Sequence, residues 1–180
     1  MSDDRRLVEQ ARAGDLSAFD ELVRTYERRV RGLLSRLLDD QRDVEEATQD
    51  TFVQAWRALV RFEGRSEVFT WLYRIAVNEA LMRRRRAKPK AQELDEEAER
   101  TIGLRGDDPV ETAELRRFLA GRISALPFEY RAPLVLRDLE GLSNAEVAEA
   151  LGLTLAAAKS RIHRARMTIR AELEAWERGG

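Results

Sequence analysis

Apolar residues recur at helical spacing through most of this 180-residue chain, and that periodicity limits the folds it can adopt. The longest stripe covers about five turns of one predicted helix and consists of Phe19, Leu22, Val23, Tyr26, Val30, Leu33, Leu34 and Leu37. No segment alternates polar and apolar residues as a half-buried strand does. The pattern therefore predicts an all-α protein whose helices bury their stripes against one another.

Residues 1–88 contain four predicted helices, whose stripes need one another for burial, and are expected to form one N-terminal helical bundle. The first helix covers about residues 4–13 and stops at Gly14, and Ser17 is predicted to cap the second. A third helix follows, with Val44, Ala47, Thr48, Phe52, Ala55, Trp56 and Leu59 on its inward side. The fourth covers about residues 67–86, after a loop of residues 62–66.

Residues 108–180 predict a second helical domain that ends in a helix-turn-helix. Asp108-Pro109 is a helix start, and a later helix contains Pro133, which should kink or shorten it. A Ser143-x-x-Glu146 capping box opens a short helix, Gly152 occupies the turn, and Thr154 caps a long last helix. Its inward residues are Ala158, Ile162, Ala165 and Ile169.

The formal net charge of −1 hides a segregation of charge along the chain. Residues 83–90 carry six cations and no acid, and residues 159–170 are again purely basic. Between them, residues 89–107 are acidic and weakly apolar, which predicts a flexible linker between the two domains. Basic blocks of this kind favour a polyanionic partner more than the net charge implies.

Composition excludes several classes of chemistry. The chain has no cysteine and only one histidine, His163, so disulfide scaffolds, thiol catalysis and a zinc site are not expected. No nucleophile–base pair supports a hydrolase, and no cofactor motif is present. The N-terminus lacks a signal peptide and no apolar run is long enough for a membrane span, so we expect a cytoplasmic protein without membrane insertion.

The last helix is the first candidate interface. Its outward face presents Ala156, Lys159, Ser160, His163 and Arg164. Small residues near the helix start allow close approach to DNA, and Lys, Arg and Ser side chains can bond base edges or phosphates. Arg166 and Arg170 lie further along, where phosphate contacts are expected. A solvated basic face would be the alternative, but the capped short helix and glycine turn favour DNA binding.

Two further groups of residues stand out in the N-terminal half. Trp71, Arg74 and Asn78 share one face of the fourth helix, with Tyr73 nearby and Phe62, Arg65, Ser66 and Phe69 in the loop and helix start. Aromatic rings beside cations suit the binding of unpaired bases, although from the residues alone Trp71 and Tyr73 could equally be core residues. On the third helix, Glu46, Gln49, Asp50 and Arg57 form either a solvated face or a docking surface for a basic partner.

Three segments resemble extracytoplasmic-function (ECF) sigma factors. DVEEATQDTFVQAWRAL resembles the segment that binds core RNA polymerase, and FEGRSEVFTWLYRIAVNEALMRRRR resembles the segment that recognises and melts the minus-ten element. ALPFEYRAPLVLRDLEGLSNAEVAEALGLTLAAAKSRIHRAR is similar to the minus-thirty-five-binding domain. The resemblance covers residues 7–173 and implies a non-enzymatic subunit with sigma region 2 in residues 1–88 and sigma region 4 in residues 108–180.

The resemblance also implies roles for individual residues. The positions that match polymerase contacts are Asp43, Glu46, Gln49, Asp50, Trp56 and Arg57. Those that match minus-ten DNA contacts are Phe62, Arg65, Ser66, Phe69, Trp71, Tyr73, Arg74 and Asn78. Those that match minus-thirty-five contacts are Ala156, Lys159, Ser160, Arg161, His163 and Arg164. The implied partners are the β′ clamp helices and β flap of core RNA polymerase, promoter DNA and an anti-sigma factor. A helix-turn-helix regulator that acts without polymerase is the alternative.

Overall fold

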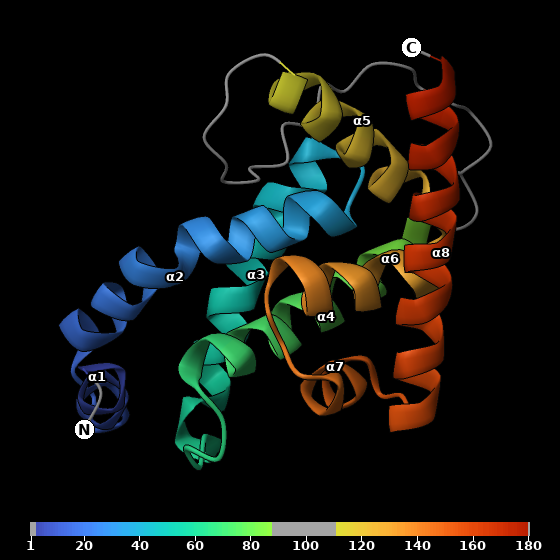
Figure 1. Ribbon diagram of the computed structural model, residues 1–180. Coiled ribbons are helices and arrows are strands. Elements are labelled where there is room, and N and C mark those ends of the chain that lie inside the picture. The colour runs from blue at the N-terminus through green and yellow to red at the C-terminus, as the bar shows by residue number, and fades with distance from the viewer. Residues whose placement is uncertain (1–2, 88–110, 180) are drawn as a thin grey trace. The chain divides into compact units, whose positions relative to one another are not determined.

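The computed structural model describes residues 3–87 and 111–179, and every regular element in these ranges is helical (Figure 1). Two compact units divide the chain, the first containing residues 1–88 and the second most of the remainder. The first holds α1 (Asp3–Arg12), α2 (Leu16–Leu37), α3 (Gln41–Ala58), η1 (Leu59–Arg61) and α4 (Val68–Ala87). The second holds α5 (Glu111–Ala125), α6 (Phe128–Leu134), η2 (Val135–Leu139), α7 (Asn144–Leu151) and α8 (Leu155–Gly179). The all-α prediction is confirmed.

The first unit is built around mutual burial of the stripes of α2, α3 and α4, each of which packs against the other two. Small residues at the crossings, such as Ala47 on α3 and Ala80 on α4, are fully buried and let the helix backbones approach closely. The buried hydroxyls of Thr48 and Thr51 donate to the backbone carbonyls four residues earlier, at 2.7 Å in both cases. These bonds satisfy polar groups that would otherwise destabilise the core.

The capping residue of α2 differs from the prediction. Asp15, rather than Ser17, is the N-cap, and its Oδ1 accepts from the backbone N–H groups of Ser17 at 2.9 Å and Ala18 at 3.3 Å. Gly14 precedes it with φ of 99°, a conformation that lets α1 end and the chain turn. The helix consequently begins two residues earlier than a Ser17 cap would allow.

In the second unit, α5 and α6 both pack against α8, and α6 lies alongside α8 in Figure 1. Pro133 shortens α6 as predicted, because proline has no N–H to donate to the preceding turn. The chain continues as a π-helical turn, η2, in which the Glu140 N–H donates to the Val135 carbonyl oxygen at 3.0 Å. Arg131 is buried here and donates from Nη1 to the Ser124 carbonyl oxygen at 2.9 Å.

The helix-turn-helix forms as its sequence signals predict. The Ser143 N–H donates to Glu146 Oε2 at 2.8 Å and the Glu146 N–H donates to Ser143 Oγ at 3.2 Å, which completes a reciprocal capping box at the start of α7. Gly152 has φ of 63° in the turn. Thr154 Oγ1 accepts from the Ala157 N–H at 3.1 Å and caps α8. Local hydrogen bonds therefore fix where the last helix begins.

The structure leaves two predictions untested, and it tests the expected absence of a membrane span only on the described residues. The linker predicted over residues 89–107 and the helix start at Asp108 lie outside the described residues. Among the residues that are described, no helix is long and apolar enough to cross a membrane.

Candidate nucleic-acid interface and acidic face

The outward face of α8 presents the residues predicted to contact DNA. Ala158, Ile162 and Ala165 are buried, and this places the opposite side of the helix toward solvent. Exposed on that side are Ala156, Lys159, Ser160, His163 and Arg164, whereas Arg161 is half-buried. Because Thr154 fixes the first turn, these side chains project from a defined helix start. Within the described ranges no cluster of His, Cys, Asp or Glu could hold a metal ion.

Arg166, on the basic helix α8, forms an ion pair within the second unit. Its Nε and Nη2 donate to the two carboxylate oxygens of Asp138, at 2.9 and 2.5 Å, in a bidentate ion pair. The hydrogen bonds to Asp138 raise the pKa of Arg166. Arg166 therefore ties α8 to η2, so much of its guanidinium is already engaged within the protein, and its contact with phosphate stays a prediction.

The loop before α4 and one face of that helix bring together most of the second candidate group. The Phe62 and Trp71 rings lie with centroids 4.7 Å apart, and Gly64, with φ of 69°, shapes the loop between them. Trp71 is half-buried and Asn78 is exposed, so an indole face and an amide are presented on the same side of α4. Arg65 is exposed and pairs with Glu63 at 2.6 Å, and Ser66 is half-buried.

Tyr73 does not belong to this surface. It is 0% exposed, and its ring packs edge-on against Phe69 with centroids 5.9 Å apart. The Arg29 guanidinium from α2 lies 5.0 Å from the Phe69 ring centroid and 5.8 Å from that of Tyr73. The prediction that Tyr73 contacts DNA is therefore wrong for this structure, in which Tyr73 is a core residue. Phe62 is also buried, and it supports Trp71 rather than offering a free ring.

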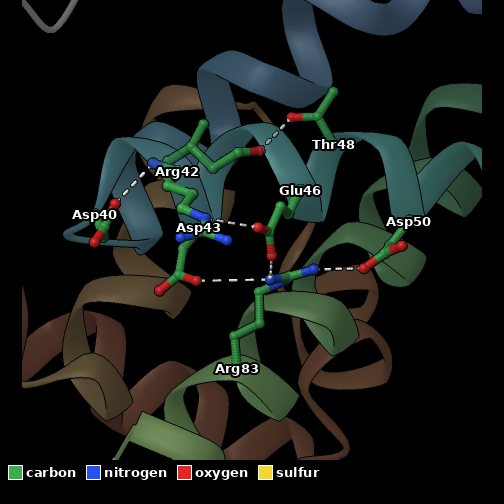
Figure 2. Close-up of polar contacts among 8 residues, drawn as sticks. Asp40, Arg42, Asp43, Glu46, Thr48, Asp50 and Arg83 are labelled. Atoms are coloured by element: carbon green, nitrogen blue, oxygen red, sulfur yellow. Dashed lines mark hydrogen bonds and ion pairs between the residues drawn. The ribbon is translucent and has the colours of Figure 1, made fainter. Parts of the chain in front are cut away.

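The acidic residues predicted on α3 gather around one arginine from α4 (Figure 2). Arg83 Nη1 lies 3.0 Å from Glu46 Oε2 and 3.6 Å from Asp43 Oδ1, and Arg83 Nη2 pairs with Asp50 Oδ2. Arg42 donates from Nε to the other oxygen of Glu46 at 3.0 Å. Gln49 is exposed beside them. Sequence reasoning missed Arg83, because within the RRRR run no local signal separates it from its neighbours.

These contacts alter the titration of both partners. Hydrogen bonds from Arg83 first, and Arg42 second, hold the pKa of Glu46 below its ordinary value of 4.5. Burial would lower the pKa of Arg83, but its hydrogen bonds with Glu46 and Asp50 outweigh this and raise the pKa. The Glu46–Arg83 pair is thus charged at neutral pH.

At its C-terminal end the same side of α3 becomes apolar. Trp56 is 36% exposed rather than inward-facing, and its ring lies edge-on to Phe19 with centroids 5.0 Å apart. Val53 and Arg57 on α3 and Val60 on η1 are also exposed. The outer side of this helix therefore carries carboxylates in its first half and exposed apolar side chains near its end.

Comparison with family models assigns both units. Residues 22–89 match the model described as Sigma-70 region 2, and residues 119–169 match the model described as Sigma-70, region 4. The first match covers α3, α4 and the loop between them, and the second covers the helix-turn-helix. The fold and these surfaces thus define a sigma-70-type transcription factor.

Relatives that match nearly the whole chain show to which group of sigma-70-type factors it belongs. The chain is 38% identical over 181 residues to the ECF RNA polymerase sigma-E factor of Haemophilus influenzae, covering 95% of both proteins. It is 37% identical over 177 residues to the RNA polymerase sigma-H factor of Pseudomonas aeruginosa, covering 92% of this chain and 91% of that protein. The chain belongs to the ECF sigma factors, which are non-enzymatic proteins that direct transcription initiation by RNA polymerase at promoters.

Solved structures agree with this fold. CnrH, in complex with the cytosolic domain of CnrY, aligns with a TM-score of 0.69 at 28% identity, over 96% of this chain and 97% of CnrH. The sigma factor RpoE of Bartonella quintana, in complex with the anti-sigma factor NepR, aligns with a TM-score of 0.71 over 88% of this chain and 98% of RpoE. At 22% identity the second likeness concerns the fold alone.

The ion cluster on α3 predicts a specific pH dependence of stability. Because the folded-state pKa of Glu46 lies below 4.5, its carboxylate stabilises the protein at neutral pH, and this contribution is lost as the pH falls through the lowered pKa. Glu46→Gln should therefore be less stable than the parent at neutral pH and match it in strong acid. Urea denaturation at several pH values from neutral to strongly acidic measures the difference in the free energy of unfolding between the variant and the parent. In an Arg83→Met background the difference should shrink, and a difference of constant size at every pH would contradict the assignment.

Proposed function

We propose that this sigma factor divides its work among three surfaces: the acidic face of α3 docks on core RNA polymerase, the loop and α4 surface captures minus-ten bases, and α8 reads the minus-thirty-five element. The observation that carries the proposal is the capped start of α8, where exposed Lys159 and Arg164 project opposite a buried stripe. The family assignment supports RNA polymerase as the partner, and the local geometry supports the division of work among the three surfaces.

Recognition of the minus-thirty-five element is assigned to the first turns of α8. A recognition helix enters the major groove by its N-terminal part, where base edges are within reach. The cationic side chains of Lys159 and Arg164 can donate hydrogen bonds to the edge of a guanine base. Ser160 and His163 lie on the same exposed side of the helix. Ala156 leaves the helix start uncrowded. The Asp138–Arg166 pair supports this role indirectly, because it anchors α8 just beyond the reading positions.

Capture of minus-ten bases is assigned to Trp71, Arg74 and Asn78, with Arg65 and Ser66 from the loop. Stacking of an unpaired base on an indole is sequence-tolerant, whereas an amide can read a base edge with a paired donor and acceptor. Phe62 supports the Trp71 ring from the protein side. Binding of unstacked bases offsets the free-energy cost of opening the duplex, which is how a protein without catalytic groups promotes melting.

Polymerase docking is assigned to the outer side of α3. Asp43, Glu46 and Asp50 offer carboxylates to a basic surface, and Trp56 offers a partly exposed ring of the kind that is enriched at protein interfaces. Gln49 and Arg57 extend the polar rim. The β′ clamp helices are the proposed partner of this face, and the β flap is the proposed partner of the second unit.

Inhibition by an anti-sigma factor is part of the proposal. CnrH and the Bartonella quintana RpoE were both solved with a partner protein, the cytosolic domain of CnrY in one case and the anti-sigma factor NepR in the other. At 28% identity over nearly the whole chain, CnrH supports a similar partner for this protein. We place the free protein in the cytoplasm, where polymerase and promoter DNA are found. Affinity purification from the native cell should recover an inhibitor together with the tagged chain, and recovery without any inhibitor would count against it.

Alanine substitution should separate sequence reading from simple charge on α8. Lys159→Ala and Arg164→Ala should change which minus-thirty-five variants are tolerated, at about 1–3 kcal/mol for each lost base contact. Arg170→Ala removes the same charge further along the helix and should weaken all variants alike. Scoring a promoter library with each variant holoenzyme provides the measurement. A uniform loss for Lys159→Ala and Arg164→Ala would mean that this face is only an electrostatic clamp.

Asn78→Ala should impair promoter opening more than initial binding. The side chain is exposed on α4, so its removal is expected to cost one base-edge contact, about 1–3 kcal/mol by analogy with duplex readout, and little stability. Binding of single-stranded minus-ten DNA by holoenzyme measures the contact directly, with Gln10→Ala, an exposed amide on α1, as the matched control. Equal binding by Asn78→Ala and the parent would show that Asn78 does not read a base.

A further inference from the structure

Arg83 is the most enclosed member of the ion cluster on the first unit. Its side chain is 14% exposed, whereas those of Asp43, Glu46 and Asp50 are 41%, 47% and 51% exposed. The arginine therefore approaches from the α4 side, beneath carboxylates that face outward from α3, as Figure 2 shows. A cation in this place is shielded from water and interacts strongly with the acids above it.

The three carboxylates would disturb one another without this cation. Asp43, Glu46 and Asp50 stand at spacings of three and four residues, which places them in one row along α3. Like charges at such spacings repel, and each side chain would turn away from its neighbours. Arg83 instead contacts one oxygen of each, Oδ1 of Asp43, Oε2 of Glu46 and Oδ2 of Asp50, and so orients the row from a single point.

We propose that Arg83 is a positioning residue for polymerase docking, because it holds the three carboxylates of α3 in one arrangement that a basic partner can bind. The inference rests on the proposed docking role of this face. An ordered row of acids loses less side-chain entropy when a partner binds than a row of freely rotating ones, so the arrangement raises affinity without contact between Arg83 and the partner. The partner that fits is a helix or loop with several Arg or Lys side chains.

The geometry favours a role for Arg83 in positioning the carboxylates over one in which Arg83 competes with the partner for them. A carboxylate has two oxygens and can accept about four hydrogen bonds, so one contact with Arg83 leaves each acid able to accept others. Arg42 holds the second oxygen of Glu46, but the Arg42 side chain is 86% exposed, and a partner's cation can displace it. Three acids against one enclosed arginine leave the row with an excess of negative charge. An internal cation that blocked docking would have to lie on the outer side of the row.

The test compares the affinity of full-length variants for core RNA polymerase in the absence of DNA. Arg83→Met removes the charge and keeps the aliphatic stem, and we expect affinity to fall about tenfold, the effect of releasing several side chains that binding must then order. Arg85→Met makes the same charge change at an exposed position of the same basic run and should leave affinity unchanged. Arg83→Lys should recover only part of the loss, because an ammonium cannot reproduce the fork that spans the three acids.

A second comparison separates positioning from a loss of folding. In a chain that already carries Asp43→Asn, Glu46→Gln and Asp50→Asn, the further change Arg83→Met should have no additional effect on affinity, whereas damage to the fold would still reduce it. If Arg83→Met does not fold, Arg83→Lys makes the same comparison. Unchanged or tighter docking by Arg83→Met or, in its place, Arg83→Lys would overturn the inference. If the carboxylate substitutions themselves left docking unchanged, the docking role of this face would fail instead.

Discussion

Burial of one apolar stripe per helix is the constraint from which the rest of the first unit follows. The stripe on α2, with Leu33, Leu34 and Leu37 fully buried, fixes which sides of α3 and α4 turn inward. Once those sides are fixed, an acidic row on α3 and the Trp71–Asn78 face of α4 are left at the surface. The core therefore decides which side chains are available for function.

The same reasoning explains why the charge of the whole chain says little about its partners. A net charge of −1 is compatible with DNA binding because cations and acids are placed on different elements. The start of α8 presents Lys159 and Arg164 outward, while α3 presents Asp43, Glu46 and Asp50. Ion pairs within each unit also engage some of the cations. Arg83 and Arg166 are each held by carboxylates of their own unit, so these two cations of the basic runs link helices within the fold.

Local sequence signals predicted much of the fold and part of the candidate sites. The Ser143 capping box, the Gly152 turn and the Thr154 cap depend on residues close together in the chain, and all three form as expected. Periodicity could not separate Trp71 from Tyr73, because burial on α4 depends on where α2 and its Arg29 lie. The role of Arg83 was equally hidden: its partners are 33 to 40 residues away, and only the packing of α3 on α4 brings them together. Long-range pairing of this kind has no signature in a single sequence.

We expect initiation by this protein to depend on polymerase bound through α3, rather than on DNA binding alone. Run-off transcription from a randomised promoter library, with core RNA polymerase added to the parent chain or to Glu46→Lys/Asp50→Lys, tests it most directly. The parent chain should give promoter-specific transcripts and the charge-reversed variant almost none, because a basic partner then meets like charge while the buried stripe of α3 is unchanged. Equal transcription by a folded charge-reversed variant would contradict it.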